Sequence, residues 1–85
     1  MRARVFVSLK KSVLDPQGKT IYHSLRNLGY GNIQDVRQGK FFEIYLDSSL
    51  SDEQARKEVE KMAKSVLTNP VIEEFSYEID GNNQE

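Results

Sequence analysis

The chain begins with hydrophobic residues at every second position. Val5, Val7 and Leu9 are separated by single residues, and this period of two predicts a strand with one face on a core. Further segments typical of strands follow at residues 33–37, 40–46 and 71–79. Gln38 and Gly39 lie between the first two of these segments, so the pattern predicts an antiparallel hairpin with a tight turn there.

Two segments between the strands predict helices. Asp15 and Pro16 indicate the start of the first helix. Aspartate accepts hydrogen bonds from the free amides of a first helical turn, and proline fits the first helical position. Its apolar stripe, at steps of four and three residues, is Ile21, Leu25 and Leu28. Gly29 ends this helix, since glycine readily adopts the left-handed conformation.

The second helix begins with a capping box, Ser51-Asp52-Glu53-Gln54, in which serine and glutamine satisfy free backbone amides. Asn69-Pro70 ends it. The predicted buried stripe consists of Ala55, Val59, Met62, Ala63 and Val66.

The resulting order is β-α-β-β-α-β, which predicts an α+β fold of the ferredoxin-like, split βαβ type. Right-handed crossovers would place both helices on one face of an antiparallel sheet. Residues 1–80 are expected to form this single domain. Residues 81–85 have no apolar residue to hold them and are expected to be a disordered tail.

The other face of the predicted sheet carries three aromatic residues, Phe6, Phe41 and Tyr45. A second copy or another protein covering this face is the simplest explanation, because apolar patches on a wet face reduce solubility. The alternative is that the aromatic residues are scattered and shielded by long neighbouring side chains.

Composition limits the function classes. The 85 residues include 12 basic and 13 acidic ones, with a net charge of −1, and no basic block typical of nucleic-acid binding. Cysteine is absent and His23 is the single histidine, which argues against disulfides and against a metal site. The sequence offers no membrane span and no signal peptide, so we expect a cytoplasmic protein that acts by binding other chains.

Two segments resemble ligand-binding motifs without completing them. Gly18-Lys19-Thr20 has the end of a phosphate-binding P-loop, but Val13 replaces the glycine that the loop requires. Residues 37–45 combine basic and aromatic residues like an RNA-binding strand, but in the wrong order and with Glu43 between two rings. No nucleophile and base can be paired from the remaining residues, so no catalytic residue is predicted.

With these residues in view, the chain resembles the PurS family, the small subunit of multi-subunit phosphoribosylformylglycinamidine (FGAM) synthase. The resemblance covers residues 5–79 and is carried by four motifs in the same order and spacing. They are Asp15-Pro16-Gln17-Gly18, Leu25-x-x-Leu28-Gly29-Tyr30, Val36-Arg37-x-Gly39-Lys40-x-Phe42-Glu43 and Asn69-Pro70-Val71-Ile72-Glu73.

The resemblance implies a non-catalytic subunit in purine biosynthesis. A large partner subunit would bind ATP, Mg and the ribonucleotide substrate, and a glutaminase subunit would release ammonia from glutamine. This chain would bind no cofactor itself, would join the two subunits, would help ammonia pass between them, and would form a homodimer or a higher homo-oligomer. The residues expected to touch partner subunits are Asp15, Pro16, Gln17, Gly18, Arg37, Gly39 and Lys40.

Two alternatives share the same order of elements. An ACT-like regulatory module would bind a small molecule, such as an amino acid, at a dimer interface. A small RNA-binding domain would show affinity that falls steeply with salt. The register of the four motifs favours the synthase subunit over both.

Overall fold

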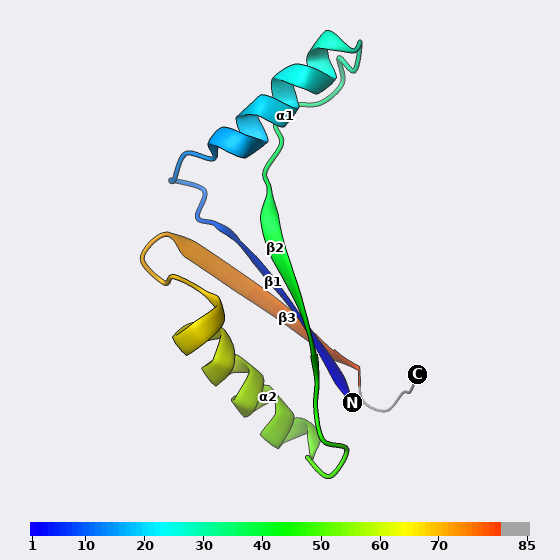
Figure 1. Ribbon diagram of the computed structural model, residues 1–85, viewed down its shortest axis with the longest axis vertical. Coiled ribbons are helices and arrows are strands. Elements are labelled where there is room, and N and C mark those ends of the chain that lie inside the picture. The colour runs from blue at the N-terminus through cyan, green and yellow to red at the C-terminus, as the bar shows by residue number, and fades with distance from the viewer. Residues whose placement is uncertain (81–85) are drawn as a thin grey trace.

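A computed structural model describes residues 1–80 of the chain. Its elements are β1 (Arg2–Leu9), α1 (Pro16–Asn27), β2 (Gly39–Tyr45), α2 (Asp52–Met62), the short π-helix η1 (Ala63–Leu67) and β3 (Glu73–Asp80) (Figure 1). The predicted α+β class with an antiparallel sheet and two helices is confirmed. The expectation of a disordered tail at residues 81–85 lies outside the described residues.

The sheet has the strand order β2-β1-β3, and both neighbouring pairs are antiparallel. The first strand of the chain is therefore the central one. Its predicted alternation is confirmed, because Val5 and Val7 are buried on one face whereas Phe6 lies on the other. Val5 lies opposite Phe42 of β2 and Tyr77 of β3, so apolar side chains from all three strands share the inner face.

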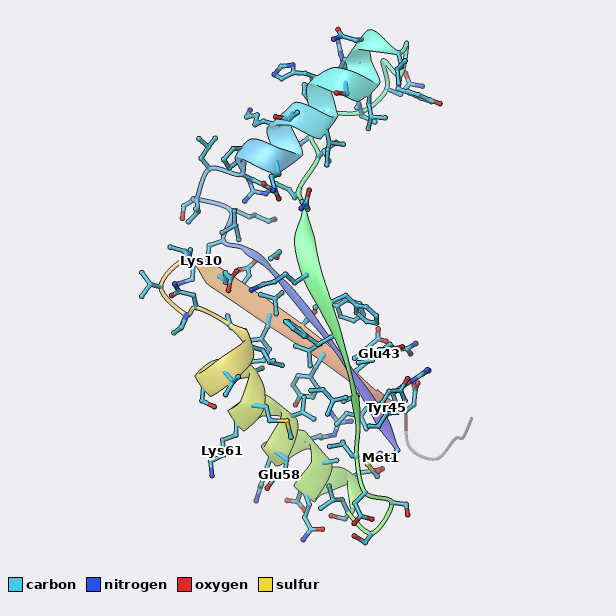
Figure 2. All side chains as sticks on the ribbon, in the orientation of Figure 1. Met1, Lys10, Glu43, Tyr45, Glu58 and Lys61 are labelled. Atoms are coloured by element: carbon cyan, nitrogen blue, oxygen red, sulfur yellow. The ribbon has the colours of Figure 1, made fainter. Side chains whose placement is uncertain are left out.

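The inner face is covered by α2, whose Val59 joins the β1 valines in the core. The capping box is confirmed: Ser51 Oγ accepts a hydrogen bond from the Gln54 amide at 3.1 Å, and Gln54 Oε1 accepts one from the Ser51 amide at 3.0 Å. Glu58 and Lys61 point away from the sheet, so the charged side of this helix faces outward (Figure 2).

The end of the second helix differs from the predicted stripe. Val66, expected in the core, is 78% exposed, whereas Leu67 packs against the core cluster. The reason is the π-helical turn, which contains more residues than an α-turn and so shifts the following side chains around the axis. A fixed helical period cannot anticipate this shift.

The first helix is built as predicted at both ends. Asp15 caps the N-terminus, and Gly29 ends the helix with a φ of 103°. The amide of Gly29 donates to the Arg26 carbonyl at 3.0 Å and that of Tyr30 to the Leu25 carbonyl at 3.1 Å, which are the two hydrogen bonds of a Schellman motif.

The position of α1 differs from the plan in which both helices cover one face. The helix extends beyond the end of the sheet instead of lying over it (Figure 1). Of its own residues only Gly18 is buried, and the apolar stripe remains open, with Leu28 76% exposed.

The segment 33–37, predicted as a strand, also differs. Within residues 1–80 it pairs with no strand, and the tight turn at Gln38 and Gly39 is not formed. Instead the chain runs from α1 directly into β2 (Figure 1). The physical reason is that the Gln38 amide is held by a side chain far away in sequence, the carboxylate of Asp15.

Candidate functional site

The residues predicted to touch partners converge at the base of α1. We call Asp15–Gly18 together with Arg37–Lys40 the joint. Asp15 is only 5% exposed, and its carboxylate accepts hydrogen bonds from the amides of Gly18 at 2.9 Å and Gln38 at 2.8 Å. The Gln38 amide, and then that of Gly18, hold the pKa of the Asp15 carboxyl below its ordinary value against the opposing effect of desolvation.

Arg37 stabilises the joint by hydrogen bonds to the segment that follows β1. Its Nη2 donates to the carbonyl oxygens of Lys10 at 3.0 Å and Val13 at 3.1 Å, with a longer contact of 3.5 Å to Leu9. The expected contact of this guanidinium with a partner subunit would therefore compete with hydrogen bonds inside the chain. Sequence reasoning missed this internal role, because the carbonyls lie 24 to 28 residues away.

Two glycines of the joint allow close backbone contact. A Cβ added to Gly18 would lie 2.4 Å from the Val36 carbonyl oxygen, and one added to Gly39 would lie 2.4 Å from that of Val7. Real Cβ atoms essentially never approach another heavy atom this closely. Both positions thus require glycine, which explains these two glycines without invoking a partner.

The exposed side of the joint is polar. The side chains of Gln17 and Gln38 share a hydrogen bond of 2.6 Å, and Lys40 Nζ lies 3.4 Å from a carboxylate oxygen of Glu73. The Asn69 amide, donating at 2.7 Å, is the main cause that lowers the pKa of the Glu73 carboxyl. A hollow of about 310 Å³ lies between these side chains and the end of β1. Its chemistry offers hydrogen bonds and charge, with no nucleophile–base pair among the described residues.

The structure brings together two of the three aromatic residues predicted for self-association. The rings of Phe6 and Phe41 stack with centroids 5.2 Å apart, and the side chains are 40% and 52% exposed. A second hollow, of about 460 Å³, lies beside this pair. Tyr45 is at the far end of the same face, opposite Arg2, where its hydroxyl donates to Glu43 at 3.2 Å (Figure 2).

That far end is a charged cluster which sequence reasoning missed. Asp80 accepts from Arg2 at 2.8 Å and lies 3.3 Å from Arg4, which in turn lies 3.3 Å from Glu78. The Arg2 hydrogen bond is the main cause that lowers the pKa of the Asp80 carboxyl. Because these pairs bridge neighbouring strands, the outer face divides into an aromatic half and an ion-paired half. Alternating sequence positions showed the shared face but could not show this division.

Neither a metal site nor a membrane helix is evident in residues 1–80. No three His, Cys, Asp or Glu side chains in this part of the chain are grouped so that they could hold a metal ion. None of its helices combines the length and apolar character needed to cross a bilayer.

The sequence and fold were compared with known proteins. The family model described as PurS, phosphoribosylformylglycinamidine (FGAM) synthase, matches residues 2–81. The chain is 42% identical over 79 residues to the PurS subunit of phosphoribosylformylglycinamidine synthase from Bacillus subtilis, covering 93% of this chain and 92% of that protein.

Two solved structures resemble the fold. PurS from Methanocaldococcus jannaschii, described as one of the subunits of formylglycinamide ribonucleotide amidotransferase in the purine biosynthetic pathway, matches with a TM-score of 0.85 and 35% identity. That match covers 96% of this chain and 98% of the other. A chain in the structure of PurLQS from Thermotoga maritima matches with a TM-score of 0.76 and 29% identity, covering 91% and 93% of the two chains. Together with the family match, these similarities show that the chain belongs to the PurS family of FGAM synthase.

Proposed function

We propose that this chain is the small subunit of a multi-subunit FGAM synthase, a ligase of purine biosynthesis, and that it contributes binding surfaces and no catalytic residue. The observation that carries the proposal is the family match over residues 2–81, which leaves almost no part of the chain for another function. No comparable observation favours the ACT-like or the RNA-binding alternative. The proposal includes the cytoplasmic location expected from the sequence.

The proposed partners are a large subunit, which binds ATP and Mg, and a glutaminase subunit. A complex of PurL, PurQ and PurS is named for the Thermotoga maritima protein whose chain this one resembles. By this analogy the chain joins the two larger subunits as a homodimer or a higher homo-oligomer.

The proposed role in ammonia transfer has a chemical reason. Ammonia released into neutral water is mostly protonated, and the ammonium ion is no longer a nucleophile. A route closed to water by packed subunits keeps it reactive.

The joint is the proposed contact with a partner subunit. Its backbone is fixed by the Asp15 and Arg37 hydrogen bonds, so that Pro16, Gln17 and Lys40 lie on the surface in a defined arrangement. Preorganised polar groups lose little conformational entropy on binding, which favours specific recognition. The Phe6–Phe41 pair is the proposed site for self-association or for a second contact.

The decisive experiment is reconstitution of the enzyme with and without this chain. The large and glutaminase subunits are assayed for FGAM formation, first with glutamine and then with added ammonium salt as the nitrogen source. We expect the chain to be required for glutamine-dependent synthesis, whereas the ammonium-dependent rate persists without it. Equal glutamine-dependent rates in the presence and absence of the chain would refute the proposal.

The contact at the joint is tested by paired variants. Lys40→Ala is expected to weaken co-elution with the larger subunits, because Lys40 lies in the joint. Lys57→Ala, an exposed lysine of α2, is the matched control and should leave co-elution unchanged. If Lys40→Ala also co-elutes like the natural chain, the partner surface lies elsewhere.

A further inference from the structure

The outer face of the sheet, opposite α2, is a regular array of side chains. No helix within residues 1–80 covers it, because α2 packs on the inner face and α1 extends beyond the end of the sheet (Figure 1). The strand register aligns the side chains of this face in rows, with one residue from each strand. In the order β2, β1, β3, the rows are Gly39, Ser8 and Glu74; Phe41, Phe6 and Ser76; Glu43, Arg4 and Glu78; and Tyr45, Arg2 and Asp80.

In two of these rows an arginine of β1 is paired with an acidic residue of β3. Arg2 donates to Asp80 at 2.8 Å, and Arg4 Nη2 lies 3.3 Å from Glu78. On the other side Arg2 lies 3.7 Å from Glu43 of β2. Opposite charges that face each other across neighbouring strands stabilise a sheet. Each acidic residue in this half of the face therefore has an arginine of the same chain beside it.

Glu74 has no such arginine. Its neighbour on β1 is Ser8, a short residue without charge. Within residues 1–80 the ion pairs of β3 are made by Glu73, Glu78 and Asp80, whereas Glu74 is exposed and makes none. The four acidic and two basic residues in the rows give the outer face a formal charge of −2. Complementary charge favours a basic partner on this face.

The hollow of about 460 Å³ beside the stacked rings lies next to Glu74. We call it the recess. Its volume is within the range of about 300–1,000 Å³ that is typical of sites for small groups. The recess combines short side chains, which leave room, with exposed aromatic rings and a carboxylate; the residues concerned are Ser8, Gly39, Ser76, Phe6, Phe41 and Glu74.

An arginine side chain matches both kinds of group. Its guanidinium is planar, so it can stack on an aromatic ring and at the same time donate two hydrogen bonds to a carboxylate. A purely apolar side chain would instead remove water from Glu74 without replacing its hydrogen bonds, which costs free energy. A nucleic-acid backbone, or the same face of a second copy, would bring negative charge to a negative surface.

We infer that the recess binds an arginine side chain of one of the larger synthase subunits. The guanidinium stacks on the Phe6–Phe41 pair and forms an ion pair with Glu74. It takes the place beside Glu74 that the chain's own arginines take in the two ion-paired rows. This inference rests on the proposed function and specifies the chemistry of a contact on the outer face, separate from the joint.

The affinity of the purified larger subunits for this chain tests the inference. Glu74→Gln should weaken binding about tenfold, because a charge-assisted hydrogen bond is lost. Phe41→Leu keeps an apolar side chain but removes the ring, and should weaken binding about two- to fivefold. Glu58→Gln is the matched control, since it removes the same charge from the outward side of α2 (Figure 2) and should bind like the natural chain. Circular dichroism checks that each variant is folded.

The arginine itself can be identified by cross-linking. The photoreactive residue p-benzoylphenylalanine, placed at position 76 in the recess, should attach to a segment of a larger subunit that contains an arginine. Replacing that arginine by lysine should weaken binding. Combined with Glu74→Gln, it should cost little more than the larger of the two single losses, because the two groups act as a pair.

Several results would overturn the inference. One is a Glu74→Gln variant that binds as tightly as the natural chain, or a control that weakens as much. Others are independent effects of Glu74 and the cross-linked arginine, or a single-stranded oligonucleotide that binds in the recess. A change in the mass of the isolated chain on Glu74→Gln, seen by light scattering, would show that a second copy occupies the face. Failure of the natural chain to bind either larger subunit would refute the proposed function as well, whereas the other results leave that function standing.

Discussion

The substitution Gly18→Ala is predicted to destabilise the protein, although the same change usually stabilises a helix. Gly18 is in the first turn of α1, and replacing glycine by alanine in an exposed helix commonly gains up to about 1 kcal/mol. Here the new Cβ would lie 2.4 Å from the Val36 carbonyl oxygen and 2.7 Å from a carboxylate oxygen of Asp15. The first is a backbone atom, and the second belongs to a carboxylate that is held in place by the amides of Gly18 and Gln38.

The expected magnitude follows from the contacts that must shift. Forcing an extra carbon into a packed site costs about 1–3 kcal/mol, and the displaced Asp15 carboxylate would also lose part of its hydrogen bonding to Gln38. After subtracting the gain in helix propensity, we expect a net loss of about 1–2 kcal/mol. For a domain of this size each 1 kcal/mol lowers the Tm by about 4–8 °C.

The assay is urea denaturation followed by far-ultraviolet circular dichroism, at one fixed protein concentration because association contributes to stability. Gly31→Ala is the matched control, because a Cβ at Gly31 meets no atom within 4 Å and its φ is not positive. The control should be as stable as the natural chain or slightly more stable. If Gly18→Ala matches the control, the close packing of the joint is not a source of stability and the reasoning fails.

Three further predictions follow from the core, the joint and the outer face. Val59→Ala, at a fully buried site of α2, should lower the free energy of unfolding by about 2–3 kcal/mol in urea denaturation. Val66→Ala, at an exposed site of η1, should change it by no more than about 0.5 kcal/mol, and equal losses would contradict the outward position that the π-turn gives Val66. Because the pKa of the Asp15 carboxyl is lowered in the folded chain, its stabilising effect is fully present above the ordinary pKa of 3.8 and disappears as the pH falls through the lower folded-state pKa. The stability difference between the natural chain and Asp15→Asn should therefore shrink as the pH falls below 3.8 in pH-dependent unfolding, and a difference independent of pH would refute this. Phe41→Ser should reduce association through the outer face. Light scattering should then show a loss of species larger than a dimer, or co-elution with the larger subunits should be weaker. If neither changes, the Phe6–Phe41 pair does not lie in an interface.

Local signals predicted the parts of the fold that local interactions determine. The Ser51–Gln54 capping box and the Gly29 helix end depend on residues within six positions of each other, and both formed as expected. The strand alternation of β1 also predicted its buried face correctly, because the pleat fixes which side chains share a face. These elements could be predicted because each depends on interactions between residues that are close together in the sequence.

The joint could not be predicted, because its bonds connect residues far apart. The Asp15 carboxylate and the Gln38 amide are separated by 23 positions. The pattern of hydrophobic residues does not predict a hydrogen bond between them. The segment 33–37 looks like a strand in the sequence, but the described residues form no strand there. The sequence did place Asp15, Gly18, Arg37 and Gly39 among the important residues, although their observed contacts are inside the chain.

The central place of β1 affects how the protein can be made. On the ribosome β1 must wait for β3, since Arg2 pairs with Asp80 across 78 positions. Such long-range pairing delays folding, because most of the chain has to be present before the sheet can close. We therefore expect the nascent polypeptide to emerge without a finished core and to fold only once β3 has been synthesised, so that a product lacking β3 would be a target for chaperones and proteases.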